Sequence, residues 1–209
     1  PAVSGQGLAH VLETEGVGFM ALDLDPDRVR TAAAAGEPKS LPAALAVGDV
    51  VIGAFGNDDG GTDAGAVYIF SGPISGTQFL SAANLELTGE APGDQAGYSV
   101  ASAGDYNGDG RDDILVGSWA NDTTATDAGT TYLIHGGDSG VRSLSLADGI
   151  FWGGEAGDFS GWSVSTAGDT DGDGYDDIVV GSQNYGTYDN GRAYVYHGTR
   201  SGVSTTAAT

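Results

Sequence analysis

Two segments of this chain place oxygen-bearing side chains at the spacing that a hard metal ion requires. They are residues 105–113, with the sequence DYNGDGRDD, and residues 169–177, with the sequence DTDGDGYDD. Each has Asp or Asn at loop positions 1, 3 and 5, Asp at position 9, and glycine at positions 4 and 6. Ca²⁺ takes about six to eight oxygen ligands at about 2.3–2.6 Å, and glycine allows the sharp turns that bring alternate side chains together. Both segments are therefore predicted to bind Ca²⁺.

The helix-flanked calcium loop known as the EF-hand shares the first part of this pattern. That loop requires a bidentate acid at position 12, where this chain has Val116 and Val180. Residues 97–104 and 161–168, which precede the loops, are short β-prone runs bounded by glycine, as are the apolar residues that follow. The pattern predicts that the cation closes a β-hairpin. A turn rich in Asp and Gly that binds no metal is the alternative.

Composition narrows the possible partners and compartments. The chain has 7 Lys+Arg against 29 Asp+Glu, a formal net charge of −22, which disfavours binding to nucleic acid or anionic lipid. A hydrophobic content of 40% argues against a disordered acidic chain. No apolar run of about 20 residues is present, so no membrane insertion is expected. Calcium loops fill readily in the millimolar Ca²⁺ found outside cells, which predicts an extracellular or cell-surface location.

Strand-like segments recur along the chain at a fixed interval. Gly53, Gly117 and Gly181 are spaced by 64 residues, and the chain contains 37 glycines, which suit the tight turns of an all-β repeat. The recurring segments are 49–55, 113–119 and 177–183, then 65–72, 129–136 and 191–198, and a further strand at 85–90 and 150–155. Four strands in about 64 residues match one β-propeller blade, so the predicted fold is all-β with about three blades of four antiparallel strands.

The same residues resemble the FG-GAP repeat, which builds the β-propeller of integrin α-subunits and of many bacterial surface proteins. The resemblance lies in the pairs Gly97-Tyr98 and Gly161-Trp162, in the two Asp-rich loops, and in a Gly-Ala or Gly-Ser pair after each second strand; it covers residues 49–198. It implies a propeller that holds Ca²⁺ in the hairpin between the first two strands of a blade.

The resemblance also implies that loop position 7 contributes its backbone carbonyl to the cation. The ligands predicted for the first site are Asp105, Asn107, Asp109, Arg111 and Asp113. Those predicted for the second site are Asp169, Asp171, Asp173, Tyr175 and Asp177.

A single domain over residues 1–209 is expected, with repeats at 10–72, 85–136 and 150–198. Residues 26–45 are interpreted as an insertion into the hairpin of the first repeat, and 199–209 as the start of a further strand.

The first repeat departs from the loop pattern. Its Gly-aromatic pair is Gly18-Phe19, followed by Asp23, Asp25 and Asp27, but Arg and Thr occupy positions 6 and 9. A third calcium site would require Asp49 as its last acid, and a solvated turn is the competing interpretation.

Three blades are fewer than the four to eight of a typical closed propeller. Residues 11–15 (VLETE) have the pattern of the fourth strand that the last repeat lacks before Thr209. Two interpretations remain open. The chain is a fragment of a larger propeller, or it donates this strand to a neighbouring copy, which would build a head-to-tail ring or filament.

Several other motifs have ordinary explanations. Residues 137–140 (GDSG) match the nucleophile segment of trypsin-like proteases, but the equivalent Ser-Gly in the other repeats is a turn. His135 and His197 occupy equivalent positions in separate blades, cannot reach one metal, and are expected to be structural. The three tryptophans could form a sugar-binding platform, although core packing is the simpler explanation; they are Trp119, Trp152 and Trp162.

The sequence therefore predicts a non-enzymatic module for adhesion or self-assembly at the cell surface, with a protein partner or a second copy of itself. FG-GAP-like propellers also accompany lyases and phospholipases, but no paired acid and base lie outside the calcium loops. A carbohydrate-binding propeller, or a non-catalytic module of a polysaccharide-active enzyme, is the alternative.

Overall fold

The structure, a computed structural model, describes residues 18–21, 29–30, 49–72, 74, 77–184 and 190–200. Within these residues the fold is all-β, apart from two 3-10 turns, η1 (Leu80–Ala82) and η2 (Leu144–Leu146). No described segment forms a helix long and apolar enough to cross a membrane. The strands are β1 (Gly18–Ala21), β2 (Val29–Arg30), β3 (Val50–Ala54), β4 (Ala66–Phe70), β5 (Thr77–Gln78), β6 (Leu85–Thr88), β7 (Ser99–Gly104), β8 (Asp113–Ser118), β9 (Thr130–Ile134), β10 (Gly140–Ser143), β11 (Gly149–Trp152), β12 (Ser160–Gly168), β13 (Asp177–Ser182) and β14 (Arg192–Tyr196).

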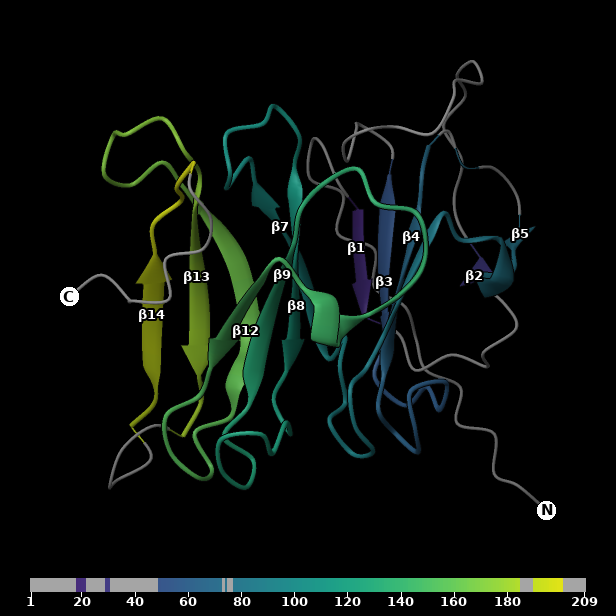
Figure 1. The fold of residues 1–209 in the computed structure, drawn as a ribbon, viewed down its shortest axis with the longest axis horizontal. Coiled ribbons are helices and arrows are strands. Elements are labelled where there is room, and N and C mark those ends of the chain that lie inside the picture. The colour runs from purple at the N-terminus through teal and green to yellow at the C-terminus, as the bar shows by residue number, and fades with distance from the viewer. Residues whose placement is uncertain are drawn as a thin grey trace.

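Of the four sheets in the described residues, the three larger ones stand side by side (Figure 1), and the fourth is the short pair β2-β5. The middle sheet has four antiparallel strands in the order β11-β9-β8-β7, which is the predicted composition of one propeller blade. The first sheet has the order β1-β3-β4-β6-β10, and the third has the order β12-β13-β14. The prediction of propeller blades is confirmed.

The interval of 64 residues reappears in the backbone. Gly65 bridges Ala96 in parallel, and Gly129 bridges Ser160 in the same way, so each blade is linked to the next at an equivalent point. Left-handed backbone conformations recur at the same interval, for example at Asp63 (φ 52°) and Asp127 (φ 51°). Equivalent residues therefore occupy equivalent places in successive blades.

Both faces of the middle sheet are buried, which explains its continuous apolar runs. On β8, Ile114 and Val116 face the core shared with the first sheet, and Leu115 faces the core shared with the third sheet. Successive side chains of a strand point to opposite faces, so each blade packs against both neighbours. The first core contains Val51, Val67, Ile69, Leu85, Leu87, Ala96, Ile114, Val116, Tyr132, Ile134 and Leu144. The second contains Ala101, Ala103, Tyr106, Leu115, Leu133, Phe151, Ile178, Val180 and Tyr196.

A glycine near the end of the second strand of a blade lets neighbouring backbones approach. A Cβ atom at Gly117 would overlap the carbonyl oxygen of Gly161 in the next blade. The equivalent pair, Gly53 and Gly97, has the same close contact between the first two blades. The repeated glycine is therefore required by packing between blades.

The first sheet differs from the sequence prediction in the pairing of its strands β1 and β3. Strand β1 runs parallel to β3, with Gly18 opposite Val50 and Ala21 opposite Gly53, so the two do not form the hairpin expected for the first repeat. Parallel neighbours need a crossover connection of about a dozen residues or more, and the long stretch of chain between these strands provides that length.

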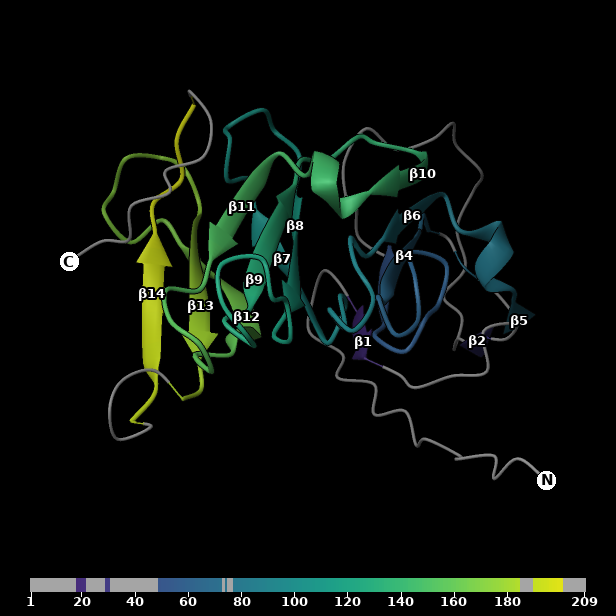
Figure 2. The same ribbon diagram turned by 60° about the horizontal axis from the view of Figure 1, so that its bottom comes forward.

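Two further pairings were not foreseen. Strand β2 lies within the predicted insertion 26–45 and pairs with β5. Strand β10, which begins at the last residue of the GDSG segment, pairs in parallel with β6 of the first sheet. Both strands are labelled in Figure 2. Both pairings join segments that are distant in the sequence.

Candidate metal centre

Both predicted loops connect antiparallel strands and lie at the same end of the molecule. Residues 105–112 join β7 to β8, and residues 169–176 join β12 to β13 (upper end of Figure 1). Each hairpin contains a register shift just before its loop, between Ser102 and Gly104 in one and between Thr166 and Gly168 in the other. The predicted β-hairpin setting is confirmed, and helices do not flank the loops.

In the first loop, backbone amides hold the side chains at positions 1, 3 and 5 on the inside of the turn. The Asp109 amide donates to Oδ1 of Asp105 (2.9 Å) and to Oδ1 of Asn107 (2.8 Å). The Gly110 amide donates to Oδ2 of Asp105 (2.9 Å), and the Arg111 amide donates to Oδ1 of Asp109 (3.0 Å). Oxygen atoms from three alternate residues thus converge on one turn.

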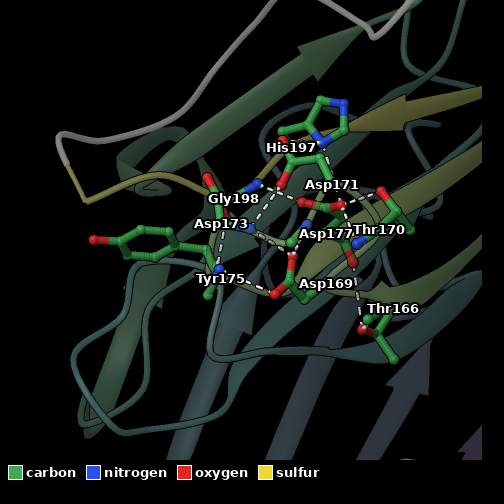
Figure 3. Close-up of polar contacts among 12 residues, drawn as sticks. Thr166, Asp169, Thr170, Asp171, Asp173, Tyr175, Asp177, His197 and Gly198 are labelled. Carbon is green, nitrogen blue, oxygen red and sulfur yellow. Dashed lines mark hydrogen bonds and ion pairs between the residues drawn. The ribbon is translucent and has the colours of Figure 1, made fainter.

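The second loop has the same construction, shown in Figure 3. Asp169 accepts the amides of Asp173 at Oδ1 (3.1 Å) and Gly174 at Oδ2 (3.0 Å), and the Tyr175 amide donates to Oδ1 of Asp173 (3.0 Å). Carboxylate oxygens of Asp169, Asp171 and Asp173 lie within 4.8 Å of one another. Three carboxylates at this separation repel one another unless a cation or protons neutralise them.

The aspartate at position 9 has a second role that the sequence did not indicate. Oδ1 of Asp113 accepts the Gly136 amide (2.8 Å), and Oδ1 of Asp177 accepts the Gly198 amide (2.9 Å). Both side chains are fully buried. Each aspartate therefore ties the start of the second strand of its blade to the end of the third.

Asp49 has the same contact in the first repeat, where its Oδ1 accepts the Gly72 amide at 2.6 Å. The signal available in the sequence was an Asp before the second strand and a Gly after the third, repeated three times.

The remaining oxygen of the position-9 aspartate differs between the two hairpins. Oδ2 of Asp113 is buried and has no hydrogen-bond partner, and burial raises the pKa of this carboxyl to about 6. A buried carboxylate oxygen without a partner is costly, and a cation in the loop would provide one. The orphaned oxygen fits a bound divalent cation, although among the described residues the carboxylates of Asp105, Asp109 and Asp113 do not all lie within 4.8 Å of one another as those of Asp169, Asp171 and Asp173 do.

In the second hairpin, Oδ2 of Asp177 accepts hydrogen bonds from the amide (2.8 Å) and the hydroxyl of Thr170, and it lies 3.2 Å from Nδ1 of His197. Burial opposes ionisation of this carboxyl, but these contacts and the Gly198 amide outweigh burial and lower its pKa. The surroundings of Asp177 therefore favour its ionised form.

The other predicted ligands also fall in the two loops. The side chain of Arg111 turns toward the neighbouring strand end, where its Nη1 lies 3.4 Å from the carbonyl oxygen of Gly136. The ring of Tyr175 packs over Gly108 of the first loop. The possible third site at Asp23, Asp25 and Asp27 lies outside the described residues.

The two histidines differ more than their equivalent positions suggested. Nδ1 of His135 lies 3.9 Å from Oδ1 of Asp148, and the charge of this histidine, when protonated, acts to lower the pKa of Asp113 at position 9 of the first loop. Nδ1 of His197 lies 3.2 Å from Oδ2 of both Asp171 and Asp177. Sequence reasoning missed the second contact because it depends on where β14 ends relative to the loop.

Two of the three tryptophans belong to an aromatic cluster at the contact between blades. The ring centroid of Trp162 lies 5.3 Å from that of Trp119 and 4.9 Å from that of Tyr98. The side chains of Trp119, Trp162 and Tyr98 are half-buried. Trp152 stands apart on β11 and is 40% exposed.

Comparison with known proteins agrees with the repeat structure. The FG-GAP repeat family model matches residues 96–134 and 160–196, and each match contains one of the two loops. Integrin alpha-PS2 of Drosophila melanogaster is 34% identical over 127 residues, which cover 56% of this chain and 9% of that protein. Integrin alpha-6 of Gallus gallus is 34% identical over 128 residues, covering 57% of this chain and 11% of that protein. The chain thus spans about a tenth of the length of these relatives.

Proposed function

The chain contains FG-GAP repeats, and from this premise we propose that it is an extracellular β-propeller module whose hairpins bind Ca²⁺ and which serves adhesion or assembly at the cell surface. The observation that carries the proposal is the buried, unpartnered Oδ2 of Asp113, at position 9 of a loop whose amides hold the oxygens of Asp105 and Asn107 on the inside of the turn. A divalent cation in this turn would complete the coordination of that oxygen.

The proposed ligands are ten, five in each hairpin. The first set is Asp105, Asn107, Asp109, the carbonyl of Arg111, and Asp113; the second is Asp169, Asp171, Asp173, the carbonyl of Tyr175, and Asp177. The bound ion would neutralise carboxylates that otherwise repel one another. Because the unfolded chain has no preformed loop, the free energy of metal binding would become free energy of folding.

The adhesive role is inferred from the relatives, which are named as integrin alpha chains. A protein ligand or a second copy of the chain is the partner that this role implies. We propose one domain over residues 1–209 and no catalytic activity.

Chelation of calcium tests the proposal. A site held at about 100 times its Kd adds about 2.7 kcal/mol, and about 1 kcal/mol shifts the Tm of a chain of this size by about 2–4 °C. Excess EDTA should therefore lower the Tm by roughly 10–20 °C if both sites empty. Calcium titration should give a stoichiometry of about two.

Added Ca²⁺ in excess over EDTA should restore the Tm, and the same concentration of Mg²⁺ should restore it much less, because Mg²⁺ prefers a rigid octahedral site with several waters. A melting curve that EDTA leaves unchanged would contradict the proposal.

The aromatic cluster supports glycan binding as a second candidate function. Trp119, Trp162 and Tyr98 bring half-buried rings together from two blades, and such rings combine a large apolar face with a polar group, as a sugar-binding surface would require. If the cluster binds a glycan, glycan-array binding should be lost in Trp162→Ala and retained in Trp152→Ala. Absence of binding by the unmodified chain would exclude this candidate.

A further inference from the structure

The imidazole of His197 points into the second calcium loop. Its Nδ1 is 3.2 Å from Oδ2 of Asp171 and 3.2 Å from Oδ2 of Asp177, and the three atoms lie within 4.8 Å of one another. Figure 3 shows the three side chains together. The Gly198 amide, which donates to Oδ1 of Asp177, fixes the chain next to this imidazole. The three side chains come from the loop, from β13 and from the end of β14.

A neutral ring nitrogen with its lone pair directed at two carboxylate oxygens would be repelled by both. Close approach requires a proton on Nδ1 or a cation among the three atoms. In a tetrahedral zinc site with metal–ligand distances of about 2.0–2.1 Å, ligand atoms are about 3.3 Å apart. The two distances of 3.2 Å agree with this spacing.

We propose that His197, Asp171 and Asp177 form a mixed nitrogen–oxygen site for a transition-metal ion of the zinc class. Imidazole is a good ligand for Zn²⁺ and its neighbours, whereas Ca²⁺ is bound by oxygen. The second hairpin would therefore select a different set of ions from the first, although the two loops share one sequence pattern.

The first hairpin lacks both features that distinguish the second. Position 3 is Asn107 in place of an aspartate, so a charged ligand is replaced by an amide. The equivalent histidine, His135, faces Asp148, whose carboxylate also contacts Arg142. The first hairpin thus serves as a control in which the equivalent histidine forms its ion pair with a residue outside the loop.

The inference concerns the same hairpin as the proposed calcium function, and zinc and calcium would compete for Asp171 and Asp177. It rests on the loop geometry of that proposal but does not require that calcium be the resident ion. Calcium and zinc titrations therefore separate the failure of one from the failure of the other.

The test is calorimetric titration of Zn²⁺ into tag-free, calcium-loaded protein. The unmodified chain should bind one Zn²⁺ with displacement of one Ca²⁺. His197→Asn should weaken zinc binding by at least about tenfold. Loss of an outer-shell partner of a metal ligand already costs about 10–100-fold in metal affinity, and His197 would be a direct ligand. His135→Asn should leave zinc binding unchanged.

Equal zinc affinity in the unmodified chain and His197→Asn would overturn the inference. Zinc that fails to bind while two Ca²⁺ still bind would overturn it and leave the calcium proposal standing. If neither hairpin binds Ca²⁺ but zinc binding depends on His197, the calcium proposal fails and this inference holds.

A spectroscopic measurement on the unmodified protein avoids any folding defect in a variant. The chain has only 3 histidines, so their ring nitrogens can be resolved by ¹H–¹⁵N correlation. On addition of Zn²⁺, the Nδ1 resonance of His197 should shift and the ring of His135 should not. Shifts at both rings, or at neither, would contradict the site.

Discussion

At the scale of single residues, two equivalent aspartates have different environments. Asp113 has a buried Oδ2 without a partner, and burial raises its pKa to about 6. Asp177 has its Oδ2 occupied, because position 2 of its loop is Thr170, whose hydroxyl donates to it, whereas the first loop has Tyr106 at that position. The first aspartate therefore gains more from a cation, and the second is already ionised before a cation arrives.

The first prediction concerns the central carboxylate of each loop. Asp109→Ala and Asp173→Ala should each remove one calcium from a stoichiometry of two, because each residue holds position 5 of only one loop. Calorimetric titration with Ca²⁺ measures this directly. Glu155→Ala, an equal change of charge at an exposed residue outside the loops, should still bind two. Retention of two sites in either loop variant would contradict the assignment.

The second prediction concerns Asp94, a buried carboxylate in the segment between β6 and β7. Burial raises its pKa from 3.8 to about 6, although the Asn121 amide (2.8 Å) and the Ala91 backbone amide work against this. The folded chain then binds a proton more tightly than the unfolded chain. This group therefore favours folding below about pH 4 and loses that contribution as the pH rises to about 6, by about 1–3 kcal/mol.

Denaturant unfolding at fixed saturating Ca²⁺ between pH 4 and pH 8 measures the effect. Asp94→Asn should flatten the loss of stability between pH 4 and pH 6. The equivalent residue in the next blade, Asp158, accepts the Gly154 and Glu155 amides, and Asp158→Asn should lower stability at both ends of the range. An unchanged slope in Asp94→Asn would contradict the pKa assigned to this carboxyl.

At the scale of elements, the two hairpins that we propose to bind Ca²⁺ contact each other. The Asp105 amide donates to Oδ2 of Asp176 at 2.8 Å, and the Asp176 amide faces the carbonyl oxygen of Asp105 at 3.3 Å. The ring of Tyr175 lies where a Cβ at Gly108 would be. The second hairpin therefore supports the residue that begins the first loop.

The third prediction follows from this contact. In the Asp173→Ala background, where only the first hairpin should titrate, Asp176→Ala should weaken calcium binding by about two- to tenfold, the equivalent of one lost hydrogen bond. Calorimetric titration provides the affinity. Asp176→Asn keeps an acceptor oxygen and should retain most of the affinity, which separates the hydrogen bond from the charge. If Asp176→Ala binds as tightly as its parent, the hairpins act independently.

The elements that the sequence predicts well are those whose partners are close along the chain. The loops at 105–113 and 169–177 and the hairpins around them depend on turn residues and on alternating side chains within about a dozen positions. The parallel pairs of β1 with β3 and of β10 with β6 join segments that are distant in the sequence, so no local sequence pattern indicates these pairings. The approach of His197 to its loop was missed for the same reason, since β14 places it there.

At the scale of the whole molecule, the sheets succeed one another with equivalent contacts. Strand β12 of the third sheet packs against β7 of the second. The aromatic cluster, with Trp119 facing Phe159 at 5.1 Å, fills the same junction. Because every blade is packed mainly against its neighbours, each junction should contribute separately to stability, as in other repeat proteins.

The last prediction concerns the third sheet, which has three strands in the described part of the chain where the second sheet has four. From the sequence pattern of residues 11–15, we propose that this segment of a second copy adds to the third sheet as a strand. Strand addition satisfies a sheet edge with main-chain hydrogen bonds, and the head-to-tail contact that it creates leads to a ring or a filament. Light scattering after size exclusion in millimolar Ca²⁺ should then give masses above the 20.9 kDa of one chain.

Proline removes a backbone donor, so Leu12→Pro should return the protein to one chain per particle, whereas Ala2→Pro, outside the donated strand, should not. The chain has no cysteine, which allows a direct assay of the contact. Copies carrying Glu13→Cys and copies carrying Val195→Cys should form a mixed disulfide-linked dimer when combined, because strand addition brings one donor strand beside one β14. A single monomeric peak at every concentration, with no mixed dimer, would show that the third sheet is not completed by another copy.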